Sequence, residues 1–167
     1  IENNVSSVKV NIDVSGHWYN HWPLLQISLN GVTIFDDVIQ GDRCIHLDLD
    51  CDHHNLLTFR HYGRRFGEDG IWDSAADGSE ARVLVINDIR FDGISIDHLR
   101  SQLVFKTQWS TLQLQQETQE FIDQRSEFAC NGMMSFNGTI DLEFNTPIYN
   151  WLTLNKYKVP MTESAYF

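Results

Sequence analysis

The sequence predicts an all-β fold, an antiparallel and jelly-roll-like β-sandwich of about nine strands. Apolar residues alternate with polar ones in many short stretches, which is the pattern of a strand with one buried face. Turn-forming residues separate these stretches at regular intervals, and no long amphipathic helix lies between them. Facing sheets explain this pattern better than any alternation of strands with helices.

The first half of the chain supplies five of the expected strands. They are Val8–Val14, Leu25–Leu29, Val32–Phe35, Cys44–Cys51 and Leu57–Phe59. Asn30 and Gly31 separate the second from the third, and this dipeptide is the strongest short-range signal for a β-hairpin. We therefore expect these two strands to pair directly.

The second half supplies the remaining strands and three less regular segments. Strands are expected at Val83–Phe91, Ile94–His98, Leu103–Phe105 and Ile140–Phe144. The apolar run Val83–Ile86 is typical of a strand covered on both faces, and Asp92-Gly93 predicts a second hairpin turn. Pro147–Leu152 indicates a short helical turn. The segment 113–130 is rich in Gln and Glu at Gln113–Arg125, and it fits a helix, a polar strand or a linker. Residues 153–167 are expected to form a polar tail. The whole chain, 1–167, is expected to be one domain.

Composition excludes several classes of function. The chain has 167 residues, 42% of them hydrophobic, and a formal net charge of −11. This charge repels nucleic acid and anionic lipid, so neither is an expected partner. No apolar run approaches the length of a membrane span. The three cysteines show no metal or redox spacing, and reduced thiols are expected.

No common catalytic motif is present: the sequence lacks GxSxG, a P-loop, GxGxxG before a helix, and HExxH. The chain is therefore expected not to be an enzyme. His53, His54 and His61 are expected in turns or on the surface.

Four aromatic residues in loops form the candidate ligand-binding set. They are Trp18, Tyr19, Trp22 and Trp72. Flat aromatic rings in loops stack against sugar rings or partner side chains. The same residues also cap the cores of sandwich domains, and the sequence leaves both readings open.

Acidic residues in and after the glycine-rich segment Gly63–Gly78 form the candidate metal site. The candidate ligands are Asp69, Asp73, Asp77, Asn87, Asp88 and Asp92. Carboxylate and amide oxygens on a flexible backbone suit a hard cation, which makes calcium the candidate cofactor. A solvated acidic loop without metal is the alternative.

Two segments resemble calcium-dependent carbohydrate-binding modules. Pro23–Val32 (PLLQISLNGV) is similar to a strand and turn of those modules, and Val83–Asp92 (VLVINDIRFD) followed by Ile94–Asp97 is similar to a second pair of their strands. The resemblance implies a sandwich fold and a glycan partner. It also points to Asn87, Asp88, Asp92 and Asp97 as calcium or sugar contacts.

A wider resemblance, from about Pro23 to Leu152, is to virion structural proteins of cyanobacterial tailed phages. It rests on the Asn-Gly hairpin, on Ile86–Ile94, and on the ending Asn137–Leu152 (NGTIDLEFNTPIYNWL). It implies a β-sandwich that assembles in a host cytoplasm, where free thiols persist.

The main hypothesis from the sequence is therefore a non-catalytic virion protein of a phage capsid, tail or fibre. Its expected partners are other virion proteins or further copies of itself, and host-surface glycans are a further candidate. The alternative hypothesis is a calcium-dependent carbohydrate-binding module of an extracellular protein.

Overall fold

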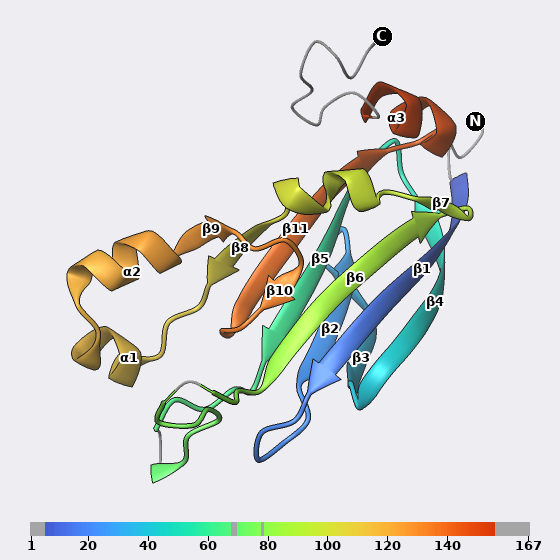
Figure 1. Ribbon diagram of the computed structural model, residues 1–167. Helices are drawn as coiled ribbons and strands as arrows, with labels where there is room; N and C mark the ends of the chain where they lie inside the picture. The colour runs from blue at the N-terminus through green and yellow to red at the C-terminus, as the bar shows by residue number, and fades with distance from the viewer. Residues whose placement is uncertain (1–5, 68–69, 78, 156–167) are drawn as a thin grey trace, which may run out of the picture.

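The computed structural model describes residues 6–67, 70–77 and 79–155, which form two antiparallel sheets packed face to face (Figure 1). The β1 sheet has the spatial order β10 (Met133–Met134), β6 (Val83–Phe91), β1 (Ser6–His17) and β4 (Gly41–Cys51), with β7 (Ile94–Ser95) paired to β6. The β5 sheet has the order β3 (Val32–Val38), β2 (Leu24–Leu29), β5 (His54–Tyr62), β11 (Gly138–Asn145), β8 (Val104–Thr107) and β9 (Glu127–Ala129).

This arrangement confirms the predicted all-β antiparallel sandwich. The described residues contain eleven strands where about nine were expected. The two additional strands are short, since β10 has two residues and β9 has three. Pieces of this length carry too little hydrophobic alternation to be detected in a sequence.

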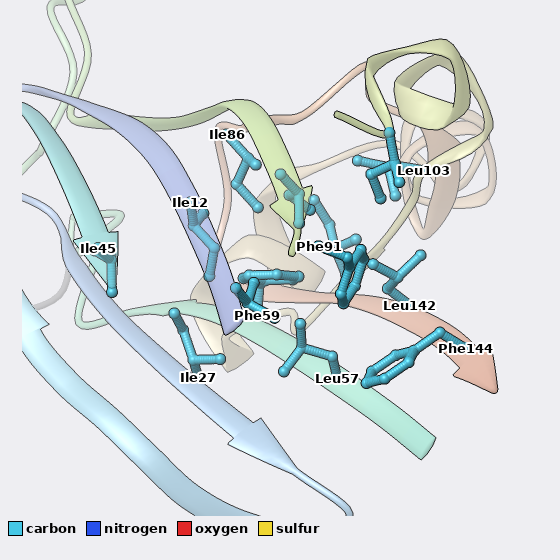
Figure 2. Packing of buried hydrophobic residues seen from close by; sticks show 14 of the residues in the cluster. Ile12, Ile27, Ile45, Leu57, Phe59, Ile86, Phe91, Leu103, Leu142 and Phe144 are labelled. Carbon is cyan, nitrogen blue, oxygen red and sulfur yellow. The ribbon is translucent and has the colours of Figure 1, made fainter. Parts of the chain in front are cut away.

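The core lies between the sheets and follows from the alternation. In β1 the side chains of Val8, Val10, Ile12 and Val14 are buried, and the residues between them face outward. Figure 2 shows residues of this kind from both sheets meeting in one layer, among them Ile12 and Phe59. Burial of each side chain of this size stabilises the folded state by about 1.5–3 kcal/mol relative to leaving it exposed.

Both predicted hairpins are present. Asn30 and Gly31 adopt left-handed conformations with φ of 51° and 84°, and they join β2 to β3. Asp92 and Gly93 do the same between β6 and β7, with φ of 48° and 85°. Positive φ at both central positions is the geometry of a type I′ turn, which matches the twist of paired strands.

The helical segments are short. A 3-10 helix occupies Asp97–Gln102, so the prediction of a strand through His98 was wrong. Ser110 and Gln113 form a reciprocal capping box at α1 (Thr111–Gln116), and α2 (Gln119–Arg125) follows, so the undecided segment 113–130 is helical before β9 begins. The predicted helical turn near Pro147 is α3 (Ile148–Asn155), which takes up the start of the expected tail; the rest of that tail lies outside the described residues. No helix within the described ranges has the length and apolarity needed to cross a membrane.

Candidate functional site

Two loops that are far apart in the sequence meet at one end of the sandwich. The first joins β1 to β2, and the second joins β5 to β6 (Figure 1). Tyr19 and His21 exchange backbone hydrogen bonds around Asn20, whose φ is 62°. The Asn20 amide Nδ2 donates to the Trp72 carbonyl oxygen at 2.6 Å. This bond brings all four of the predicted aromatic residues to the same end of the molecule.

The four predicted aromatic residues divide into two exposed and two half-buried rings. Trp18 is 54% exposed and Trp72 is 47% exposed, whereas Tyr19 and Trp22 are half-buried. The rings of Trp18 and Trp22 lie edge to face with centroids 5.3 Å apart. Trp22 therefore supports Trp18, and the exposed ring of Trp18 is free to contact a ligand.

Trp72 is held by the backbone beneath it. A Cβ atom placed on Gly67 would lie 2.4 Å from the Trp72 indole, so the ring packs directly on the glycine. The φ of 81° at Gly67 is a left-handed conformation that other residues adopt only with strain. Only glycine at this position lets the indole lie so close to the chain.

An apolar groove of about 450 Å³ runs beside Trp18 on the outer face of the β1 sheet. Its lining is His17, Trp18, Ser79, Glu80, Ala81, Val83, Val85 and Met133. The strand register explains the grouping, because His17 pairs with Val83 and Met133 pairs with Val85. Met133 is 51% exposed.

This groove corrects the prediction that Val83–Ile86 is covered on both faces. Leu84 and Ile86 are buried in the core, but Val83 and Val85 face outward and are only half-buried. No described helix or strand packs over them, and they form the floor of the apolar groove.

A shallow polar groove of about 350 Å³ adjoins the apolar groove on the same face. Its lining is Asp13, Val14, Ser15, Asp42, Arg43, Cys44 and Asn87. Ser15 lies opposite Val85 in one ladder and opposite Asp42 in the other, so the two grooves share a row of the sheet.

Hydrogen bonds fix the polar groove. Asn87 Nδ2 donates to Ser15 Oγ at 2.7 Å, and Ser15 Oγ donates to Asp42 Oδ1 at 2.7 Å. Arg90 Nη1 and Nη2 donate to the two carboxylate oxygens of Asp13 at 2.6 and 3.3 Å. The bond to Arg90 holds the pKa of Asp13 below its usual value, and a bond from Cys44 acts in the same direction. Burial, followed by the neighbouring Asp13, raises the pKa of the Cys44 thiol, which stays neutral near pH 7.

Asp73, one of the predicted metal ligands, is held in a buried ion pair. It is fully buried, and its Oδ2 accepts hydrogen bonds from Arg82 Nη2 at 2.6 Å and from the Arg65 backbone N–H at 2.5 Å. Arg82 is 2% exposed, burial lowers its pKa, and it also donates to the Gly63 carbonyl. This ion pair anchors the loop that carries Trp72.

The other predicted metal ligands are dispersed. Asp69 lies outside the described residues, and Asp77 accepts a hydrogen bond from the Ser79 backbone N–H at 3.0 Å. Asp88 accepts from Ser95 Oγ at 2.6 Å, and Asp92 accepts from the Lys9 backbone N–H at 2.9 Å.

The spacing of these residues keeps them apart. Asp88 lies on β6 and Asp92 lies in the turn that follows this strand, four residues further along the chain, a span of roughly 13 Å. Among the residues that the structure describes, no three His, Cys, Asp or Glu side chains are grouped to hold a metal ion.

A buried polar cluster next to the Trp72 loop was missed in the sequence. His61 is fully buried, against the expectation of a turn or surface position, and Arg64 is 7% exposed. Burial and the charges of Arg64 and Arg82 lower the pKa of His61 to about 3. The period-two pattern of Leu57 and Phe59 continues to His61, and extending it by one step would have placed this ring on the inner face.

Comparison with known proteins gives little guidance. No protein-family model and no curated protein matches the sequence. One solved structure that is similar is vCBM60, described with a link by circular permutation between two families of calcium-dependent carbohydrate-binding modules. It has a TM-score of 0.49 and 10% identity over 80% of this chain and 88% of that one.

A second structure, vCBM60 in complex with galactobiose, has a TM-score of 0.48 and 11% identity over 80% of this chain and 95% of that one. Neither of these two structures is a virion protein. A likeness at this level carries neither a site nor a ligand over to this chain.

Proposed function

We propose that the chain is a non-catalytic domain that binds carbohydrate on the outer face of the β1 sheet. The observation that carries the proposal is the exposed Trp18 ring beside the apolar groove, with the polar groove adjoining it. A sugar ring has an apolar face and a polar edge. An exposed indole next to fixed hydrogen-bonding groups matches both parts.

The support that Trp18 receives from the chain favours this role. Trp22 packs against Trp18 at 5.3 Å, and the hydrogen bond from Asn20 to the Trp72 loop ties its loop in place. A ring that is ordered before binding loses little conformational entropy when a ligand stacks on it. The contacts proposed here are made by side chains alone. A calcium titration tests whether a metal ion also contributes to binding.

Glycan-array screening of the purified chain, followed by calorimetry on the best ligands with and without calcium, tests the proposal. Trp18→Ala should weaken binding more than tenfold, since truncation of a central aromatic contact costs about 2 kcal/mol or more. Tyr149→Ala is the matched control, because Tyr149 is 57% exposed on α3 and belongs to neither groove. Absence of binding to every glycan, or equal losses in the two variants, would contradict the proposal.

A second candidate function is assembly into a larger particle such as a virion. The observation that favours it is β3, an edge strand of the β5 sheet whose side chains are exposed or half-buried on both faces. An unpaired edge strand is a template for pairing with another chain. Sedimentation velocity over a range of concentrations tests this role, and a monomer at the highest concentration would count against self-assembly.

A further inference from the structure

We infer that the polar groove is a second subsite for the same ligand, and that this ligand is a neutral oligosaccharide longer than one ring. The inference rests on the proposed carbohydrate-binding function and adds a length and a charge class to it. Three features carry it: the continuity of the two grooves, the kind of hydrogen-bonding capacity left free, and the pairing of the cations nearby.

The continuity follows from the strand register. His17 lines the apolar groove, Asp13 lines the polar groove, and Ser15 lies between them on the same face of β1. Four residues of a strand span roughly 13 Å. A single sugar ring on Trp18 cannot reach both ends of this face, whereas a chain of several rings lying along β1 can.

Most of the polar-groove atoms that are left free to hydrogen-bond with a ligand are acceptors. Ser15 uses its hydroxyl hydrogen on Asp42 Oδ1 and accepts from Asn87 Nδ2. These bonds leave Asp42 Oδ2 and Asn87 Oδ1 to accept from a ligand, and Asp42 is exposed. Carboxylate acceptors form strong, charge-assisted hydrogen bonds. A ligand rich in hydroxyl donors therefore fits this groove.

The charges on the face disfavour an anionic ligand. Asp42 and Asp13 line the polar groove, and Glu80 lines the apolar groove. The two arginines at the polar groove are already paired. Arg90 bonds to Asp13 and Asp88, and Arg43 bonds to Asp37 at 2.8 Å. Among the described residues that line the two grooves, no lysine or arginine is left unpaired to balance the charge of a uronic acid or a sulfated sugar, which would meet carboxylates there.

Calorimetry with neutral oligosaccharides of two, four and six units, from the gluco-, galacto-, manno- and xylo-series, tests the inference. Oligogalacturonates of the same lengths are the anionic probes. For the neutral series that binds, affinity should rise at least tenfold from two to four units, and the anionic probe should bind at least tenfold more weakly than its neutral counterpart. Asp42→Ala should cost about tenfold for the longer ligands and leave the shortest one unchanged.

Asp48→Ala is the matched control, since Asp48 is an exposed carboxylate on the outer face of the same strand and lines neither groove. Circular dichroism checks that both variants fold. Equal affinities for two and six units, an unaffected long ligand in Asp42→Ala, or tighter binding of oligogalacturonate would each overturn the inference while Trp18-dependent binding remained. Loss of all oligosaccharide binding in the unaltered protein would overturn the inference and the proposed function together.

Discussion

Removal of the Asp73 carboxylate should strongly destabilise the fold, because its negative charge balances the positive charges of two buried guanidinium groups. It is fully buried and bonds to Arg82 at 2.6 Å, while Arg64 nearby is 7% exposed. Burial lowers the pKa of Arg64 to about 10, and the charge of Asp73 opposes that shift. In Asp73→Ala, both cations would lose their counter-charge in a dry environment.

The expected cost is about 3–5 kcal/mol, the usual penalty for breaking a buried ion pair from one side. A domain of this size has a total stability of about 5–15 kcal/mol, so the loss is a large fraction of it. With a melting temperature that shifts by about 2–4 °C per kcal/mol, melting should occur roughly 6–20 °C lower.

Urea unfolding followed by tryptophan fluorescence, together with scanning calorimetry, measures this loss. The double variant Asp73→Ala/Arg82→Met should be less destabilised than the sum of the two single variants, because it removes one of the buried cations with its counter-charge. Asp77→Ala in the same loop is the exposed control and should change stability little. A loss below about 1 kcal/mol for Asp73→Ala, or strict additivity in the double variant, would refute the reasoning.

Two further predictions concern the same end of the molecule. His61 is neutral in the folded chain because its pKa is lowered to about 3, whereas in the unfolded chain it binds a proton below about pH 6.5. The free energy of unfolding should therefore decrease as the pH is lowered from about 6.5 towards 3. In urea titrations, His61→Leu should lessen the decrease between pH 7 and 4.5 by roughly 2–3 kcal/mol. An equal loss in both proteins would contradict this. Gly67→Ala should displace the Trp72 indole and change the tryptophan fluorescence more than the control Gly70→Ala does. Both glycines have a positive φ, but only at Gly67 would a Cβ atom meet the ring. Identical spectra would show that Gly67 does not determine the position of Trp72.

The sandwich could be predicted because its signals are local. The alternation in β1 and the Asn30-Gly31 turn depend on neighbouring residues and on the geometry of a strand, and both are present as expected. The 3-10 helix at Asp97–Gln102 was missed because apolar residues in a segment of this length suit a strand equally well.

The candidate metal ligands could not be judged from spacing, because the sequence does not show which partners within the fold their carboxylates bond to. Asp92 bonds to the backbone of Lys9, 83 residues away, and Asp88 bonds to Arg90 and Ser95. A carboxylate that is already bonded within the fold looks the same in a sequence as one that is free to bind a cation. Asp73 is the clearest case, since it lies in an acidic glycine-rich loop and is nevertheless fully buried.

The wrong expectation for Val83–Ile86 bears directly on function. Its continuous apolar run was read as a strand covered on both faces, yet the outward Val83 and Val85 are only half-buried beside the exposed Trp18 and Met133. Keeping apolar side chains together on an outer face gives the folded monomer no core stability, and such patches commonly mark binding surfaces. The adjoining row at Ser15 is polar and fixed by hydrogen bonds, so the surface changes from apolar to acceptor-rich within one step of the ladder. A ligand that matches this change must present apolar faces and hydroxyl donors along its length, which is the chemistry of an oligosaccharide rather than of a purely apolar partner.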